Sequence, residues 1–286
     1  MLNKRIIARL DIKGPNLVKG IHLEGLRVLG SPSNFARYYY ENGIDELMYV
    51  DSVASLYQRN SLHEIVERTA EETFIPLTVG GGIRTIEDIK KVLRAGADKV
   101  SINTAAIKNP EFIKDAANRF GSSTIVVTIE TIKTETGKYL AYTDNGREFT
   151  GIDSVEWAKE LEELGAGELV VTSVDREGTG QGFDLELTSL ISRNVSIPVI
   201  AHGGAGEVND ICEVFKMGEA DAVAVASILH YETIKHIQSG RVSSEEGNIE
   251  FLRSGKCSST IQGTDISNLK EILFNAGIAC RHNIRF

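Results

Sequence analysis

Two carboxylates in this chain of 286 residues stand at the ends of apolar runs that resemble strands. Asp11 follows the run Arg5–Leu10, and Glu130 ends a second run that begins near residue 124. Two carboxyl groups that face each other across one site can divide general acid and general base work between them. We therefore predict that Asp11 and Glu130 are a catalytic pair. The alternative is that each is an ordinary solvated or ion-paired carboxylate at the end of a strand.

Glycines follow two other apolar runs, in Thr78-Val79-Gly80-Gly81-Gly82-Ile83 and in Ala201-His202-Gly203-Gly204-Ala205-Gly206. A strand that ends in several glycines lets backbone N–H groups converge on an anion with no Cβ in the way. The two glycine loops together predict a ligand with a phosphate at each end. The alternative is that the glycines only form tight turns between strand and helix. The expected phosphate-binding residues are Gly81, Gly82, Asn103 and Thr104 at one end, and Gly178, Gly203, Gly204, Ala226 and Ser227 at the other.

Further polar residues follow other apolar runs and complete the predicted site. They are Ser101, Thr172, Glu177 and His202. Lys19 lies in a glycine-containing segment after the first run, which we predict to be a loop that folds over the ligand as a mobile lid. Strand alternation places Arg5, Ile7, Arg9 and Asp11 on one side of the first strand.

The elements that must position these residues alternate between short apolar runs and amphipathic helical stretches. The expected strands lie near residues 5–12, 46–52, 75–80, 98–103, 124–131, 167–174, 198–202 and 221–226. Continuous apolar runs are typical of parallel strands covered on both faces. Eight strand-then-helix units therefore predict a (β/α)8 barrel, with a doubly wound sheet as the competing architecture.

Helix starts and an internal repeat support the barrel. Ser31-Pro32 and Asn109-Pro110 each predict an N-cap followed by proline at the first helical position, and Thr85 to Asp88 resembles a capping box. An offset of 122 residues relates Gly43–Leu47 to Gly165–Leu169, and the same offset relates the two glycine loops. This spacing indicates two half-barrels related by a twofold axis.

The expected domain organisation is a barrel over residues 1–238, a polar insert over 239–263, and a C-terminal helix and tail over 264–286. The net charge of −9 argues against a nucleic-acid surface. We expect no signal peptide and no membrane span, and therefore a cytoplasmic protein. The three cysteines and six histidines show no ligand spacing, so we expect no metal and no cofactor.

Several long motifs, in order along the chain, closely resemble the cyclase subunit of imidazole glycerol phosphate synthase, the HisF family. The stretches that carry the resemblance are Lys4 to Asp11, Lys19-Gly20, Gly43 to Leu47, Thr78 to Ile83, Ala97 to Ala106, Gly165 to Glu168, Thr172 to Arg176 and Gly203 to Gly206. The match runs through about residue 238, and the segment near 265–283 also resembles the family's last helix. Residues 239–263 would then be an insertion.

The resemblance implies a partner and a reaction. In that family a glutaminase subunit docks at the N-terminal face of the barrel and releases ammonia, which passes through the barrel interior. At the other face, ammonia reacts with a doubly phosphorylated ribulosyl-formimino-aminoimidazole carboxamide ribotide. The products are imidazole glycerol phosphate and aminoimidazole carboxamide ribotide. The family's charged gate corresponds here to Arg5, Glu46, Lys99 and Glu168.

Four residues depart from the family pattern. The resemblance implies an aspartate where Glu130 stands, a second aspartate where Glu177 stands, a serine where His202 stands and a small residue where Arg9 stands. We hypothesise that Glu130 and Arg9 form an ion pair, which would favour the ionised glutamate and weaken it as an acid.

These departures leave two rival functions open. A paralogue with the same fold and ammonia supply could amidinate a nucleotide-activated sugar for surface polysaccharide. A protein of another class could be a non-catalytic barrel that only binds phosphates.

Overall fold

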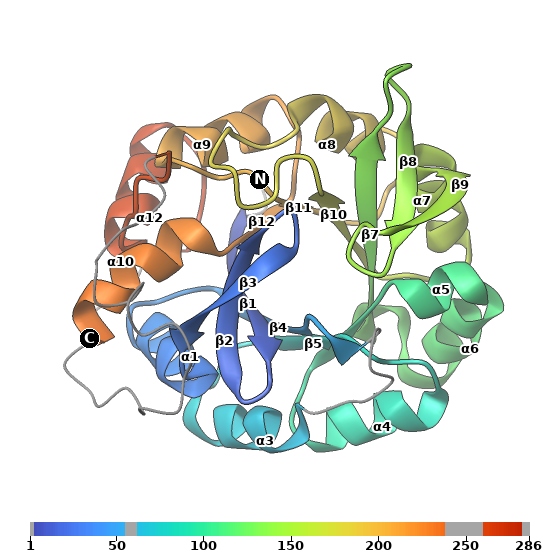
Figure 1. Cartoon of the computed structure of the whole chain (residues 1–286), viewed down its shortest axis with the longest axis horizontal. Coiled ribbons are helices and arrows are strands. Elements are labelled where there is room, and N and C mark those ends of the chain that lie inside the picture. Colours follow the sequence, from blue (N-terminus) through green and yellow to red (C-terminus); the bar gives the residue numbers. More distant parts are fainter. Residues whose placement is uncertain (1–2, 55–61, 238–259, 282–286) are drawn as a thin grey trace.

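The protein is a closed barrel of eight parallel strands surrounded by helices, as the computed structural model shows (Figure 1). The structure describes residues 3–54, 62–237 and 260–281. The barrel strands are β1 (Arg5–Lys13), β4 (Glu46–Asp51), β5 (Leu77–Gly80), β6 (Lys99–Ile102), β7 (Ile125–Lys133), β10 (Glu168–Ser173), β11 (Val199–His202) and β12 (Ala222–Val225). Parallel pairing of β12 with β1 closes the ring, which confirms the predicted (β/α)8 barrel and excludes an open doubly wound sheet.

Helices form a ring around the strands in Figure 1. They are α1 (Pro32–Glu41), α3 (His63–Glu72), α4 (Ile86–Arg94), α5 (Thr104–Lys108), α6 (Glu111–Phe120), the 3-10 turn η1 (Ser122–Thr124), α7 (Ser154–Glu163), α8 (Leu185–Ser192), α9 (Val208–Lys216), α10 (Ser227–Ile237) and α12 (Ile266–Asn275). The Thr85–Asp88 capping box opens α4, and proline occupies the first position of α1, as predicted. Helix α6 begins one residue later than expected, so Pro110 is its N-cap residue.

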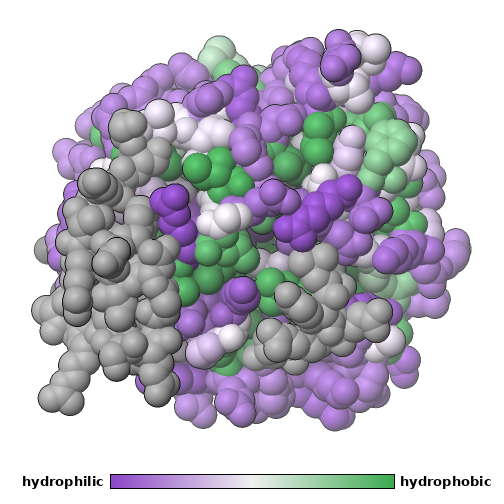
Figure 2. Space-filling view, viewed as in Figure 1, coloured by the Kyte–Doolittle hydropathy of each residue, from purple (hydrophilic) through white to green (hydrophobic). Residues whose placement is uncertain are grey.

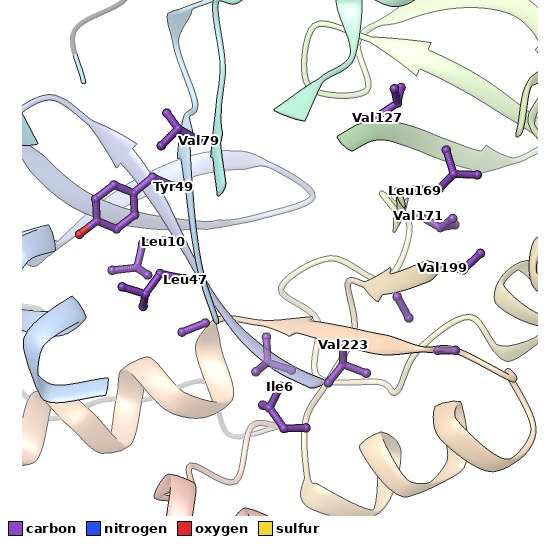
Figure 3. Close-up of a cluster of buried hydrophobic side chains, with 14 of the residues drawn as sticks. Ile6, Leu10, Leu47, Tyr49, Val79, Val127, Leu169, Val171, Val199 and Val223 are labelled. Carbon is purple, nitrogen blue, oxygen red and sulfur yellow. The ribbon is translucent and has the colours of Figure 1, made fainter. Parts of the chain in front are cut away.

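Alternation along the strands separates two apolar layers. Ile6, Leu10, Leu47 and Val79 belong to the large layer between the barrel and the helices, part of which Figure 3 shows. The barrel interior holds a second, smaller cluster, which consists of Ile7, Met48, Val126, Val170, Ile200, Ala222 and Ala224. This smaller cluster separates a charged ring at the N-terminal end of the barrel from a polar mouth at its C-terminal end.

The half-barrel repeat is visible in matched hydrogen bonds. Asp98 accepts the backbone N–H of Leu77 at 2.8 Å, and Asp221 accepts that of Val199 at 3.0 Å. In both halves, a carboxylate just before one strand thus holds the start of the preceding strand. The repeated Ala-Asp pairs therefore have a structural reason in each half.

Two antiparallel hairpins extend the barrel strands, and neither was predicted. Strands β2 (Asn16–Ile21) and β3 (Glu24–Gly30) follow β1, while β8 (Tyr139–Thr143) and β9 (Glu148–Asp153) follow β7. Hairpin β2–β3 lies over the middle of the ring in Figure 1. Because β1 and β7 continue into these hairpins, Asp11 and Glu130 lie inside their strands and do not end them. The predicted lid loop around Lys19 is wrong: Lys19 lies in β2.

Helix α12 begins after Asp265, whose side chain caps it, and ends before Gly277. Lys270 of this helix is buried, pairs with Asp45 at 2.6 Å and donates to the Gly43 carbonyl. The C-terminal helix is thus attached next to the start of β4. Most of the predicted polar insert over 239–263, namely residues 239–259, lies outside the described residues. Within the described chain, no helix combines the length and apolar character needed to cross a membrane.

Candidate active site

The mouth of the barrel contains a cavity of about 330 Å³ at the carboxyl ends of the strands. It is lined by eight of the predicted site residues, namely Asp11, Lys19, Gly81, Gly82, Ser101, Asn103, Thr104 and Glu130. Hydrophilic residues dominate the face of the molecule over which hairpin β2–β3 lies (Figure 2). The first glycine loop and both carboxylates therefore share one cavity.

A smaller pocket of about 20 Å³ adjoins the second glycine loop. Its lining includes Lys19, Glu177, Gly178, His202, Gly203, Gly204, Ala226 and Ser227. Lys19 contributes to the walls of both spaces and lies between them. Thr172 lies behind this pocket, buried and within 3.2 Å of the His202 ring. The structure thus gathers the predicted residues of the second phosphate group as well.

Asp11 is buried between two cations. Arg9 donates from Nε to Asp11 Oδ1 at 2.9 Å, and Lys19 Nζ lies 3.9 Å from Asp11 Oδ2. Burial alone would raise the pKa of Asp11, but the two positive charges outweigh it and lower that pKa below its ordinary value. Asp11 is therefore an ionised carboxylate at neutral pH.

Glu130 has the opposite electrostatic environment. Burial raises the pKa of its carboxyl to about 7, although the backbone N–H of Gly146 donates to Oε2 at 2.9 Å and opposes the shift. The hypothesised Arg9–Glu130 ion pair is wrong, because Arg9 contacts Asp11 and His202 instead. Among the described residues no cation is in contact with Glu130, and burial leaves it available in its protonated form near neutral pH.

Arg9 also connects Asp11 to the second pocket. Its Nη1 lies 3.2 Å from His202 Nδ1, while its Nε holds Asp11. Burial first, and then the charges of Arg9 and Lys19, lower the pKa of His202 well below its ordinary value. The His202 imidazole is therefore neutral.

The carboxylate and the backbone carbonyl of Glu177 bind hairpin β2–β3. One carboxylate oxygen pairs closely with Lys19, and the other accepts the Leu23 backbone N–H at 2.8 Å. Its backbone carbonyl accepts the His22 N–H at 2.9 Å. Glu177 is only 1% exposed. In this structure it fastens the hairpin to the loop after β10, a role that the sequence did not predict.

Lys19 is correspondingly enclosed. Burial lowers the pKa of its ammonium group to about 8, although Asp11 opposes this shift. The side chain is 4% exposed and lies between the two carboxylates Asp11 and Glu177. This is a fixed position under the hairpin, in contrast to the predicted place on an open loop.

Arg84, Lys108 and Asn145 are polar cavity residues that the sequence analysis did not predict. Arg84 and Lys108 line the wall near the first glycine loop, and Asn145 lines it from the turn between β8 and β9. Arg84 follows Gly82 by two residues, a signal that was available. No pattern pointed to Asn145, because its hairpin was not predicted.

A ring of four charged residues crosses the barrel near its N-terminal end. Arg5 Nη1 lies 2.7 Å from Glu46 and 3.1 Å from Glu168, and Lys99 Nζ lies 3.4 Å and 3.1 Å from the same two residues. Each carboxylate therefore contacts both cations, which agrees with the charged ring that the family resemblance implied. Among the described residues, no group of three or more His, Cys, Asp or Glu side chains is arranged to hold a metal ion.

Comparison with known proteins covers most of the chain. The family model described as "Histidine biosynthesis protein" matches residues 5–235. The imidazole glycerol phosphate synthase subunit HisF of Legionella pneumophila is 60% identical over 210 residues, which span 73% of this chain and 99% of the relative. The HisF subunits of Alkaliphilus metalliredigens and Methanocaldococcus jannaschii are 47% and 49% identical, over 82% and 83% of this chain and 93% and 95% of the relatives.

Proposed function

This chain belongs to the family of imidazole glycerol phosphate synthase subunit HisF, and from that premise we propose that it is the cyclase of that enzyme. It converts the ribulosyl-formimino-aminoimidazole carboxamide ribotide and ammonia to imidazole glycerol phosphate and aminoimidazole carboxamide ribotide. The comparisons do not favour either rival, the nucleotide-sugar paralogue or the non-catalytic barrel.

One observation carries the assignment of catalytic roles. Asp11 and Glu130 line the same cavity, and their surroundings shift their pKa values in opposite directions. Two titratable groups in one site whose surroundings shift their pKa values apart identify a general acid and a general base. Asp11 is ionised and acts as the general base, while protonated Glu130 acts as the general acid.

The substrate lies across the mouth with one phosphate at each glycine loop. The first loop offers Gly81 and Gly82, which adopt positive φ angles that suit glycine, and the nearby cations Arg84 and Lys108 line the same cavity. A side chain at position 81 would lie within 3 Å of the Asp51 backbone, so glycine is required there. The second phosphate occupies the pocket at Gly203 and Gly204.

Ammonia comes from a glutaminase subunit that docks at the N-terminal face. The ring of Arg5, Glu46, Lys99 and Glu168 is the gate through which ammonia enters the barrel. Opposite charges alternate in this ring, so none of the four charged groups is left unpaired.

Turnover of the ribulosyl substrate by the purified chain with an ammonium salt tests the proposal without the partner. We expect a bell-shaped pH–rate profile. The rate falls at low pH as Asp11 is protonated, and it falls again as the pH rises through about 7 and Glu130 loses its proton. Asp11→Asn and Glu130→Gln should each reduce kcat by about a hundredfold or more.

Glu111→Gln is the matched control, because this exposed carboxylate only pairs with Lys114 on the surface of α6. It should leave turnover unchanged. Failure of the unaltered chain to convert the substrate at any ammonium concentration would overturn the proposed reaction. An alkaline limb that persists in Glu130→Gln would overturn the acid assignment alone.

A further inference from the structure

The second phosphate pocket is lined by His202, and Arg9 contacts its imidazole from inside the barrel. His202 ends β11, directly before the glycines of the loop, and it is 3% exposed. Its Nδ1 faces the barrel interior, within 3.2 Å of both Arg9 Nη1 and Thr172 Oγ1. His202 lines the pocket together with Gly203, Gly204 and Ser227, among others.

Arg9 determines which ring nitrogen carries the proton. A guanidinium group can only donate hydrogen bonds, so the contact between Arg9 Nη1 and His202 Nδ1 is a hydrogen bond only when Nδ1 accepts. A neutral imidazole whose Nδ1 accepts carries its proton on Nε2. Nε2 lies on the other side of the ring from Arg9, and both hydrogen-bond contacts of His202 within residues 3–54, 62–237 and 260–281 are made by Nδ1. A single N–H donor is thus left over at the pocket.

We propose that His202 is a neutral Nε2–H donor to the phosphate group in this pocket, and that Arg9 is the positioning residue that fixes its tautomer. The inference rests on the proposed function only for the identity of the phosphate. Arg9 thereby joins the two parts of the site, because the same guanidinium holds Asp11 through Nε and His202 through Nη1.

Charge explains why a neutral donor suits this position. Arg9 and Lys19 already place two positive charges near the His202 ring, and Asp11 and Glu177 balance them. An additional imidazolium would face both cations in a buried environment. A neutral N–H binds phosphate without that repulsion, so the donor is independent of pH across the neutral range.

Nitrogen-15 NMR of the histidine side chains tests the tautomer directly. The His202 signals are assigned by comparison with His202→Asn, and inorganic phosphate is the probe. We expect the Nε2–H tautomer, no protonation of His202 between about pH 5 and 8, and a change of its Nε2 signal on phosphate addition. An Nδ1–H tautomer, an ordinary titration, or a signal indifferent to phosphate would overturn the proposal.

Measurement of KM and kcat with the substrate distinguishes a loss of phosphate binding in His202 variants from a general disturbance of the structure. Loss of a hydrogen bond to a charged group corresponds to roughly tenfold or more in affinity. His202→Ala should therefore raise KM by about tenfold with a smaller change in kcat, and His202→Asn, which keeps an N–H donor, should recover part of the loss. His63→Ala is the control, because this histidine is exposed at the start of α3.

The two proposals fail separately. If the unaltered chain does not turn over the substrate, the tautomer and its response to inorganic phosphate can still be measured. If turnover is normal but His202→Ala leaves KM unchanged, the cyclase assignment holds and the role of His202 is overturned.

Discussion

Hairpins β2–β3 and β8–β9 occupy equivalent places in the two half-barrels but act differently on the adjacent carboxylates. The first hairpin places the ammonium group of Lys19 beside Asp11 and helps to keep that carboxyl ionised. In the second hairpin the backbone N–H of Gly146 donates to Glu130, while burial, with a contribution from the charge of Asp144, raises the pKa of Glu130 to about 7. Because one hairpin supplies a cation and the other a neutral N–H dipole, Asp11 is ionised as a base while Glu130 keeps its proton as an acid.

Each hairpin is also held by the opposite half of the barrel. Glu177, which follows β10, binds the turn of the first hairpin, while the Asn145 side chain in the second turn donates to the Ser52 carbonyl after β4 at 2.8 Å. The half-barrels therefore exchange contacts across the mouth. Removal of one fastening is expected to affect the carboxylate on the other hairpin much less.

The two turns differ in strain. His22 and Leu23 have φ angles of 53° and 61°, and Asp144 and Asn145 have 54° and 63°. Asp and Asn tolerate the left-handed region, whereas leucine is strained there. Strained backbone persists only where the surroundings over-determine it. The first turn therefore depends more strongly on its fastening, which is Glu177.

The largest effect is expected from Glu177→Gln. The substitution leaves buried Lys19 without its closest carboxylate, and breaking a buried pair typically lowers stability by about 3 kcal/mol. Denaturant unfolding should show that loss, and hydrogen exchange of the His22 and Leu23 amides should accelerate. Lys19→Met combined with Glu177→Gln should recover part of the stability, because neither charge is then left alone. If hydrogen exchange of these amides is unchanged in Glu177→Gln alone, Glu177 does not fasten the hairpin.

The next largest effect is expected from Gly146→Ala, a substitution in the other hairpin. Gly146 has φ +75°, and an added Cβ would lie 2.9 Å from the Val174 side chain. We expect a loss of about 1–2 kcal/mol in the free energy of unfolding. Displacing the Gly146 N–H removes an interaction that lowers the pKa of Glu130, so the alkaline limb of the pH–rate profile should move above about 7.

Gly137→Ala is the matched control for that variant. Gly137 has φ +82°, but a Cβ there meets nothing within 4 Å. Gly137→Ala should show a similar loss in the free energy of unfolding, because of its positive φ angle, with no shift of the alkaline limb of the pH–rate profile. If both variants shift the limb equally, the Gly146 contact does not set the acidity of Glu130.

The strands and glycine loops could be predicted from sequence because they follow from local pattern. Continuous apolar runs and matched offsets predicted all eight barrel strands to within about two residues. The hairpins could not be predicted, since β2 and β8 are set by pairing with strands that extend beyond the barrel. The side-chain partners of Glu177 lie in hairpin β2–β3, and those of Arg9 are Asp11 on its own strand and His202 on β11, which does not pair with β1. Local pattern predicts none of these contacts, so the sequence analysis predicted a wrong ion pair for Arg9 and did not predict the fastening by Glu177.

The smallest effect is expected from Glu24→Gln, which removes the ion pair between the two hairpins. Arg147 Nε lies 2.9 Å from Glu24 Oε1, and both side chains are about half exposed. Exposed pairs contribute about 0–1 kcal/mol and are screened by salt. Stability should therefore change by less than about 1 kcal/mol, and the pH–rate profile should keep both limbs. A large loss of turnover would mean that the hairpins act as one unit through this contact, and the contrast between a cation-supplying and a dipole-supplying hairpin would then have to be abandoned.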